Sequence, residues 1–153
     1  MTSDVTPDVT IRRGDELSAP EVYAIWQIRD AVFSVEQACT DPDVDGVDLL
    51  DTCWHVWTSD EAGLTSYLRT FVTERGVRKI GRVCTRRDAR GQGLSGRLID
   101  EVHARWGAEA EIHLGAQAYL HDWYASRGYV RSGPDFVEAG IDHVPMTRPV
   151  TDV

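Results

Sequence analysis

The chain has 153 residues, of which 42% are hydrophobic and 27% charged, and its formal net charge is −9. This length and balance predict one globular domain over residues 1–153 and argue against disorder. The acidic charge argues against a nucleic-acid partner, the apolar runs are shorter than the roughly 18 residues that a membrane span needs, and three scattered cysteines indicate neither a disulfide framework nor a zinc site.

The first half of the chain predicts a strand, a long helix and a β-meander. Residues 1–8 are expected to form a loose tail and lack signal-peptide features, and the few scattered cysteines favour a reducing cytoplasm. Ser18 and Glu21 form a capping-box pattern with Pro20 between them, so a helix should begin there and end near Cys39. An acidic loop follows over 41–51, and strands are expected over 9–12, 54–57, 64–72 and 77–85.

The second half predicts alternating helices and strands. A glycine-rich loop precedes an apolar helical pattern that runs to about Trp106. A short helix is expected over 119–126, with Gly128 as its C-terminal glycine. Further strands are expected over 111–114, from 129 onward, and over 141–148. This order fits a mixed sheet with helices on both faces.

The glycine-rich loop is the strongest functional signal, and its sequence is Arg90-Gly91-Gln92-Gly93-Leu94-Ser95-Gly96. A strand, a glycine turn and a helix start present free backbone N–H groups to a phosphate. The glycine spacing also matches a dinucleotide fingerprint, but a charged segment separates it from the strand and no acidic ribose ligand follows. A Walker loop is excluded because no Gly-Lys-Ser/Thr sequence occurs, whereas a simple helix-capping turn stays open.

The loop and a downstream segment together resemble the GNAT superfamily of acetyl-CoA-dependent N-acetyltransferases. The family's Arg/Gln-x-x-Gly-x-Gly/Ala loop corresponds to Arg90, Gly93 and Ser95, with Ser95 in the place of the small residue. The second family pattern, Asn-x-x-Ala-x-x-(aromatic or aliphatic)-Tyr-x-x-x-Gly-Phe, is matched with Gln in the place of Asn by Gln117, Leu120, Trp123, Tyr124, Gly128 and Tyr129.

Other segments are similar to the ElaA-like subgroup of that superfamily. They are residues 28–37, the acidic stretch 43–48, residues 114–118, and the pattern formed by Glu138, Gly140, Ile141, His143 and Met146. The resemblance covers about residues 22–148. It implies a GNAT-like α/β fold, in which helices cover both faces of a mixed, mostly antiparallel central sheet of six to seven strands.

The resemblance also implies roles for particular residues. Backbone groups of Val83, Cys84 and Thr85 are expected to bind the pantetheine of acetyl-CoA, and an amide there could polarise the acyl carbonyl. The pyrophosphate is expected on the loop from Arg90 through Gly91, Gln92, Gly93, Leu94 and Ser95 to Gly96, with a further contact from Gln117. Tyr124 corresponds to the family's general acid.

The general base is open among several groups. Glu36 and His143 are the candidates, with Glu138 behind them, and a water relay is the alternative. The acidic loop imitates the first half of an EF-hand, but its twelfth position is Thr52 and not Glu, so calcium is not expected. No metal is predicted, and Trp26, Trp54 and Trp57 are expected in the core.

The predicted function is therefore transfer of an acetyl group from acetyl-CoA to a primary amine of a small molecule or peptide, directly between the two bound substrates. A non-catalytic acyl-CoA-binding module is the alternative, and a dinucleotide-binding oxidoreductase is a third hypothesis. The protein is expected to be a monomer or a homodimer that binds neither nucleic acid nor membranes.

Overall fold

The computed structural model describes residues 8–151 and is built on one sheet of eight strands in the order β1-β2-β3-β4-β5-β8-β6, with β7 paired to β8. All neighbours are antiparallel except β4 and β5, which are parallel. The strands are β1 (Thr10–Arg13), β2 (Cys53–Asp60), β3 (Gly63–Val72), β4 (Arg78–Thr85), β5 (Ile112–Gln117), β6 (Val130–Arg131), β7 (Phe136–Glu138) and β8 (Ile141–Arg148). The predicted mixed sheet is confirmed. Of the expected loose tail, residues 1–7 lie outside the described part of the chain.

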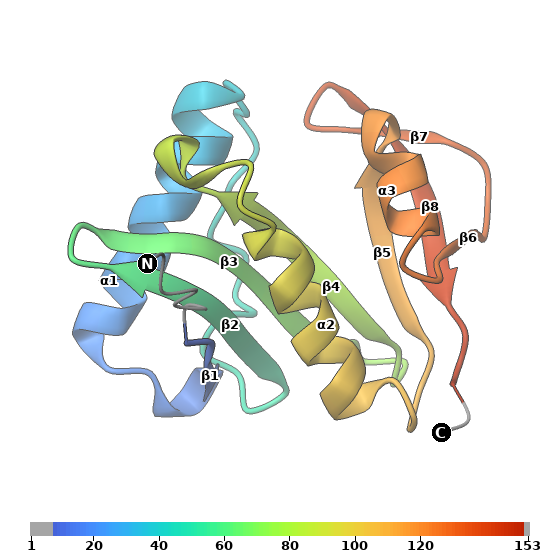
Figure 1. Ribbon diagram of the computed structural model, residues 1–153, viewed down its shortest axis with the longest axis horizontal. Helices are drawn as coiled ribbons and strands as arrows, with labels where there is room; N and C mark the ends of the chain where they lie inside the picture. Colours follow the sequence, from blue (N-terminus) through green and yellow to red (C-terminus); the bar gives the residue numbers. More distant parts are fainter. Residues whose placement is uncertain (1–7, 152–153) are drawn as a thin grey trace, which may run out of the picture.

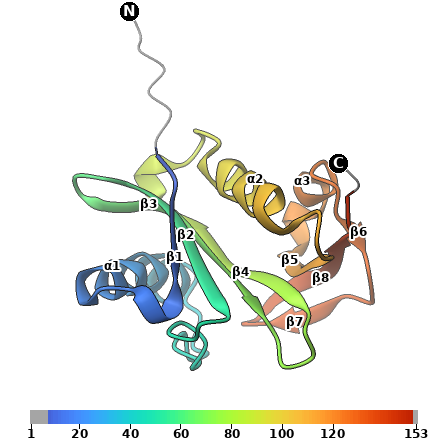
Figure 2. The same ribbon diagram turned by 90° about the horizontal axis from the view of Figure 1, so that it is seen from below.

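Helices cover both faces of the sheet, as Figure 2 shows. The main helices are α1 (Ala19–Arg29) with its continuation η2 (Asp30–Glu36), α2 (Leu94–Trp106) and α3 (His121–Ala125), and short 3-10 turns η1 (Gly14–Glu16), η3 (Arg87–Ala89) and η4 (Ala118–Leu120) join them to the strands. One core packs α1 and η2 on one face, and the other packs α2 and α3 on the opposite face. None of the helices described over residues 8–151 has the length and apolar character to cross a membrane.

The helix that leads to the functional region starts as its sequence predicts. The Ser18 hydroxyl accepts from the Glu21 N–H, and the Glu21 carboxylate accepts from the Ser18 N–H, which completes the capping box. After Arg29 the helix widens to a π-helix and ends at Glu36, three residues before the expected end. Trp26 points away from the core with 41% of its surface exposed, so its predicted core position is wrong.

Strands β4 and β5 separate along their length. They pair only where Arg78 faces Ile112 and Lys79 faces His113, and beyond this point they diverge (Figure 1). A β-bulge sits in the diverging part of β4: Tyr67 faces Cys84 and Arg69 faces Gly81, so two residues of β4 lie opposite Leu68. Among the described residues, β4 from 80 to 85 therefore has a free edge on the side of β5.

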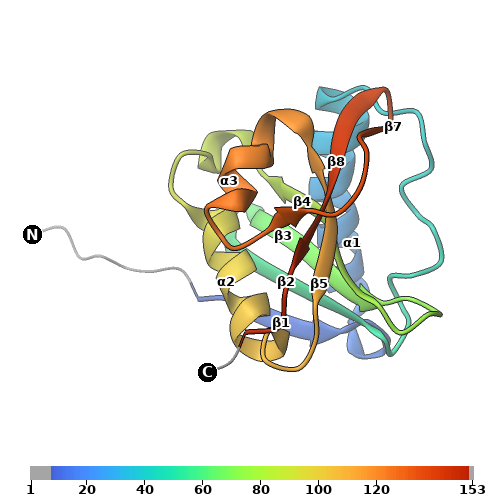
Figure 3. The same ribbon diagram turned by 90° about the vertical axis from the view of Figure 1, so that its right-hand side faces the viewer.

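Two elements differ from the sequence prediction. Strand β5 runs on to Gln117, so that residue lies in the strand beside the opening between β4 and β5. Strand β7 was not predicted, and it raises the strand number to eight. Its hairpin with β8 turns at Ala139 and Gly140, both with positive φ. Figure 3, which shows the β5 and β8 side, places this hairpin at the same end of the molecule as η2.

Candidate functional site

A large cleft of about 1220 Å³ lies where β4 and β5 diverge. One wall comes from η2 and the acidic loop, and the other from β5, α3, β7 and β8. Nearly all the residues predicted for a site line this cleft: Glu36, Val83, Cys84, Thr85, Arg90, Gly91, Gly93, Leu94, Ser95, Gly96, Gln117, Tyr124, Glu138 and His143. Gln92 is exposed and is not part of its lining.

The glycine loop is folded as a phosphate-binding turn requires. Gly91 and Gly93 have φ angles of +80° and +74°, a left-handed conformation that side chains disfavour. Helix α2 begins directly after Gly93, and the residues of its first turn, whose N–H groups lack partners within the helix, line the cleft. This geometry suits an anion such as a pyrophosphate.

Ser95, which stands where the family pattern has Gly or Ala, serves to fix the loop. Its hydroxyl lies 2.7 Å from the Thr85 hydroxyl and 3.4 Å from that of Ser66. Ser66 Oγ also donates to the Cys84 carbonyl oxygen at 3.2 Å. These contacts join β3, β4 and the start of α2, so the anion-binding turn and the free edge of β4 hold a constant relative position.

Gly96 is small for a different reason. A Cβ at Gly96 would collide with the guanidinium group of Arg127, which donates to the Gly96 carbonyl oxygen at 3.2 Å and to Asp100 at 2.7 Å. Arg127 also lies 4.7 Å from the ring centre of Trp123. It thereby ties α3, which carries Tyr124, to the start of α2. No local sequence pattern indicates this contact, because it joins residues 31 positions apart.

Two groups in the cleft have pKa values raised by burial. Burial raises the pKa of the Cys84 thiol to about 12, so this thiol stays protonated and is a poor nucleophile. Burial likewise raises the pKa of Tyr124 to about 12, so its phenol is neutral at physiological pH and can donate a hydrogen bond. No hydrogen bond joins the Tyr124 hydroxyl to another residue in the described range 8–151.

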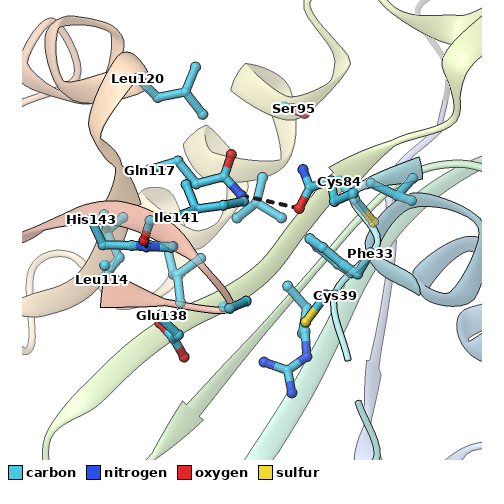
Figure 4. A pocket seen from close by; sticks show the side chains of 18 of the residues that line it. Phe33, Cys39, Cys84, Ser95, Leu114, Gln117, Leu120, Glu138, Ile141 and His143 are labelled. Carbon is cyan, nitrogen blue, oxygen red and sulfur yellow. Dashed lines mark hydrogen bonds between the residues drawn. The ribbon is translucent and has the colours of Figure 1, made fainter. Parts of the chain in front are cut away.

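The candidate base Glu36 forms a hydrogen-bonded ion pair with Arg90, the candidate ligand of the phosphate. The two side chains form a bidentate pair with N···O distances of 2.5 and 2.7 Å. The hydrogen bond from Arg90 holds the pKa of Glu36 below its usual value, so in this arrangement the carboxylate is a weak base. The next residue, Gln37, accepts a hydrogen bond from Gln117 at 3.3 Å, which is the dashed line in Figure 4.

His143 has the geometry of a proton acceptor. It lies on β8, is 8% exposed and stacks on Phe136, with 5.4 Å between the ring centres. Its Nδ1 lies 2.7 Å from the Ile141 carbonyl oxygen. Because a carbonyl only accepts, Nδ1 carries the hydrogen of the neutral ring, and Nε2 keeps its lone pair. Figure 4 shows His143, Ile141 and Glu138 on the wall opposite Phe33 and Cys39.

The acidic loop is held by arginines from three elements. Asp48, 6% exposed, accepts from Arg29 of α1 at 2.6 Å and from Arg69 of β3 at 2.9 Å. Burial alone would raise the pKa of Asp48, but its hydrogen bonds and charge interactions with the two arginines outweigh burial and lower it. Asp43 and Asp45 are bonded in the same way, mainly to Arg29, Arg82 and Arg69. These carboxylates therefore fix the cleft wall.

Stability should fall on acidification because of this loop. Arg69 lowers the pKa of Asp45 from 3.8 to about 2, so the carboxylate stabilises the fold fully above pH 3.8 and loses that effect as the pH falls towards 2. We expect the melting temperature to drop steeply between pH 4 and 2, and to drop less in Asp45→Asn, as measured by circular dichroism. Asp41→Asn, a change at an exposed position of the same loop, should melt like the parent; equal pH curves for all three proteins would contradict this role.

Within residues 8–151, no group of three or more His, Cys, Asp or Glu side chains is placed to hold a metal ion. The cleft brings together the protonic and polar groups described above. It combines an anion-binding turn, a free strand edge, a neutral phenol and an imidazole with an available lone pair.

Comparisons with known proteins agree with this geometry. Residues 53–149 match the family model of the acetyltransferase (GNAT) domain. The UPF0039 protein Rv2851c of Mycobacterium tuberculosis is 45% identical over 138 residues, which cover 88% of each chain. Protein ElaA of Escherichia coli is 36% identical over 143 residues, which cover 88% of this chain and 92% of ElaA.

Solved structures give the same result. The crystal structure of Escherichia coli ElaA superposes with a TM-score of 0.85 at 30% identity, and covers 94% of this chain and 99% of its own. The crystal structure of an acyl-CoA N-acyltransferase from Pseudomonas aeruginosa superposes with a TM-score of 0.86 at 34% identity. It covers 94% of this chain and 99% of its own. The chain therefore belongs to the GNAT acetyltransferase family and, within it, to the ElaA-like proteins.

Proposed function

We propose that the protein transfers an acetyl group from acetyl-CoA to a primary amine, with both substrates bound in the cleft at once. The observation that carries this proposal is the joint placement of the anion-binding turn at Gly91 and Gly93, the free edge of β4, and Tyr124 around one cleft. A pyrophosphate on the turn and an extended pantetheine along the free edge of β4 would bring the thioester to the level of Cys84 and Tyr124.

The residues of the cleft then divide the work of acyl transfer. Acetyl-CoA supplies the activated acyl group, and a backbone N–H of β4 near Val83 polarises its carbonyl. His143 Nε2 accepts the proton that the amine loses as it attacks. This role is favoured for His143 over Glu36, because the ion pair with Arg90 occupies Glu36 and lowers its pKa.

Tyr124 serves the leaving group. The C–S bond breaks as the amide forms, and the Tyr124 hydroxyl donates a hydrogen bond or its proton to the sulfur. Burial, which raises the pKa of Tyr124 to about 12, keeps this phenol protonated until the thiolate forms. A thiolate that forms in the same desolvated cleft gains proton affinity in the same way.

Acetyl-CoA binding provides the first test. At about 100 times its dissociation constant the ligand should stabilise the fold by about 2.7 kcal/mol, and raise the melting temperature by roughly 5 °C or more. Differential scanning fluorimetry with acetyl-CoA measures this shift, and NAD at equal concentration is the control for a dinucleotide site. No shift with acetyl-CoA, or a larger one with NAD, would refute the proposal.

Turnover separates an enzyme from a module that only binds acyl-CoA. Release of free CoA thiol is followed with a panel of polyamines, amino sugars, small amines and peptides with free N-termini or lysines. Amine-dependent release supports the transferase, whereas tight binding with no release over the whole panel supports the binding module.

A further inference from the structure

Two consecutive residues at the end of η2 hold polar side chains from both sides of the cofactor channel. Glu36 pairs with Arg90 of the glycine loop at 2.5 and 2.7 Å. Gln37 accepts from Gln117 at the end of β5 at 3.3 Å. Each contact joins residues that are far apart in the sequence: Glu36 and Arg90 are separated by 54 positions, and Gln37 and Gln117 by 80. We call Glu36 and Gln37 the polar clasp.

The clasp uses the groups that the cofactor needs. The Nε of Arg90 donates to the Thr85 carbonyl oxygen at 3.1 Å, and both of its terminal nitrogens donate to Glu36. A pyrophosphate on the adjacent turn would compete with Glu36 for this guanidinium group, and the two anions would repel each other at close range. Gln117 would likewise change its hydrogen-bond partner, because the pantetheine would replace Gln37 as the acceptor.

We propose that cofactor binding opens the polar clasp, and that the released Glu36 then binds the cationic amine of the acceptor. The acceptor class is thus an amine that arrives as an ammonium ion and releases one proton to solvent before it attacks, and the cofactor must bind first. This inference rests on the proposed function. It gives Gln37 a role that its sequence did not indicate, and it makes Glu36 a positioning residue for the acceptor.

The position of η2 supports the second step. Phe33 of η2 and the nearby Cys39 line the cleft opposite His143 and Glu138, as Figure 4 shows. While Glu36 is paired with Arg90, its charge is neutralised. Once Arg90 turns to the pyrophosphate, an unpaired carboxylate is left on η2, across the cleft from the wall that carries His143, and it attracts an ammonium ion.

Affinity for CoA tests the first step, because the clasp predicts that removing a residue of the site tightens cofactor binding. Isothermal titration with CoA should give a dissociation constant about two- to fivefold lower for Glu36→Gln, the size expected for releasing one exposed ion pair. Gln37→Ala should shift in the same direction by less. Exposed Gln27→Ala should bind like the parent protein.

Asp88→Asn is the matched control, because it removes one negative charge near the glycine loop without removing a partner of Arg90. Asp88 lies near the same loop, is exposed and pairs with Arg86 at 2.6 Å rather than with Arg90. Its removal should leave CoA affinity within about 1.5-fold of the parent, because exposed charges are screened. Unchanged or weaker CoA binding by Glu36→Gln, or equal tightening by Asp88→Asn, would overturn the clasp.

With any amine that the enzyme acetylates, the KM for the amine should change in the opposite direction to the dissociation constant for CoA. Glu36→Gln should raise the KM for the amine about fivefold or more while it lowers the dissociation constant for CoA. A Glu36 that only supports the fold would weaken both. Absence of CoA binding in the parent protein would instead refute the proposed function itself, so the two failures are distinguishable.

Discussion

Tyr124→Phe should lower kcat by about 100-fold or more and leave the dissociation constant for CoA within about twofold of the parent value. The change removes only the hydroxyl, which makes no hydrogen bond to another residue in the described range 8–151, so the fold loses no internal partner. The ring keeps its edge-to-face contact with Trp123 at 4.8 Å. The rate of CoA thiol release at saturating substrate gives kcat, and titration calorimetry gives the dissociation constant for CoA.

Tyr129→Phe is the matched control for this prediction. Its ring lies 5.8 Å from that of Tyr124, it is 1% exposed, and its hydroxyl bonds to His103 at 2.8 Å, but it does not line the cleft. Loss of that hydrogen bond should reduce the free energy of unfolding by about 1 kcal/mol and leave kcat nearly unchanged. A Tyr124→Phe enzyme that retains a third or more of the parent kcat would remove Tyr124 from the role of general acid.

Local sequence signals predicted the elements that local chemistry determines. Ser18 and Glu21 place the start of α1, because a capping box satisfies the first N–H groups of a helix in any context. The glycines at 91 and 93 predict a left-handed turn for a similar reason. Strand β8 spans 141–148 as expected.

The elements that were missed depend on contacts distant in sequence. Strand β7 exists because it pairs with β8, and its turn places Ala139 where Asn or Asp would be the usual signal. The pairing of Glu36 with Arg90 joins two residues whose separate roles were predicted from a resemblance. Nothing in either segment indicates the other, so only the folded chain shows that the two roles are coupled.

The same limit applies to the acidic loop. Its aspartates imitate the first half of a calcium loop, and in the structure they pair with buried arginines in one wall of the cleft. Arg29 has 0% of its side chain exposed and Arg69 3%, and both donate to one oxygen of Asp48. A buried guanidinium group without an anion is costly, so Asp48 permits both arginines to stay inside the fold.

Asp48→Ala should therefore be strongly destabilising, by about 3–5 kcal/mol, because it leaves two buried positive charges without their shared partner. The corresponding fall in melting temperature is roughly 6–20 °C. Asp48→Asn keeps an acceptor oxygen but loses the charge, and should lie between this variant and the parent. Asp51→Ala, a change at an exposed position in the same loop, should stay within about 0.5 kcal/mol of the parent. Urea denaturation followed by tryptophan fluorescence measures all four proteins. A loss below about 1 kcal/mol for Asp48→Ala would show that water or loop movement replaces the carboxylate, and that the arginines do not depend on it.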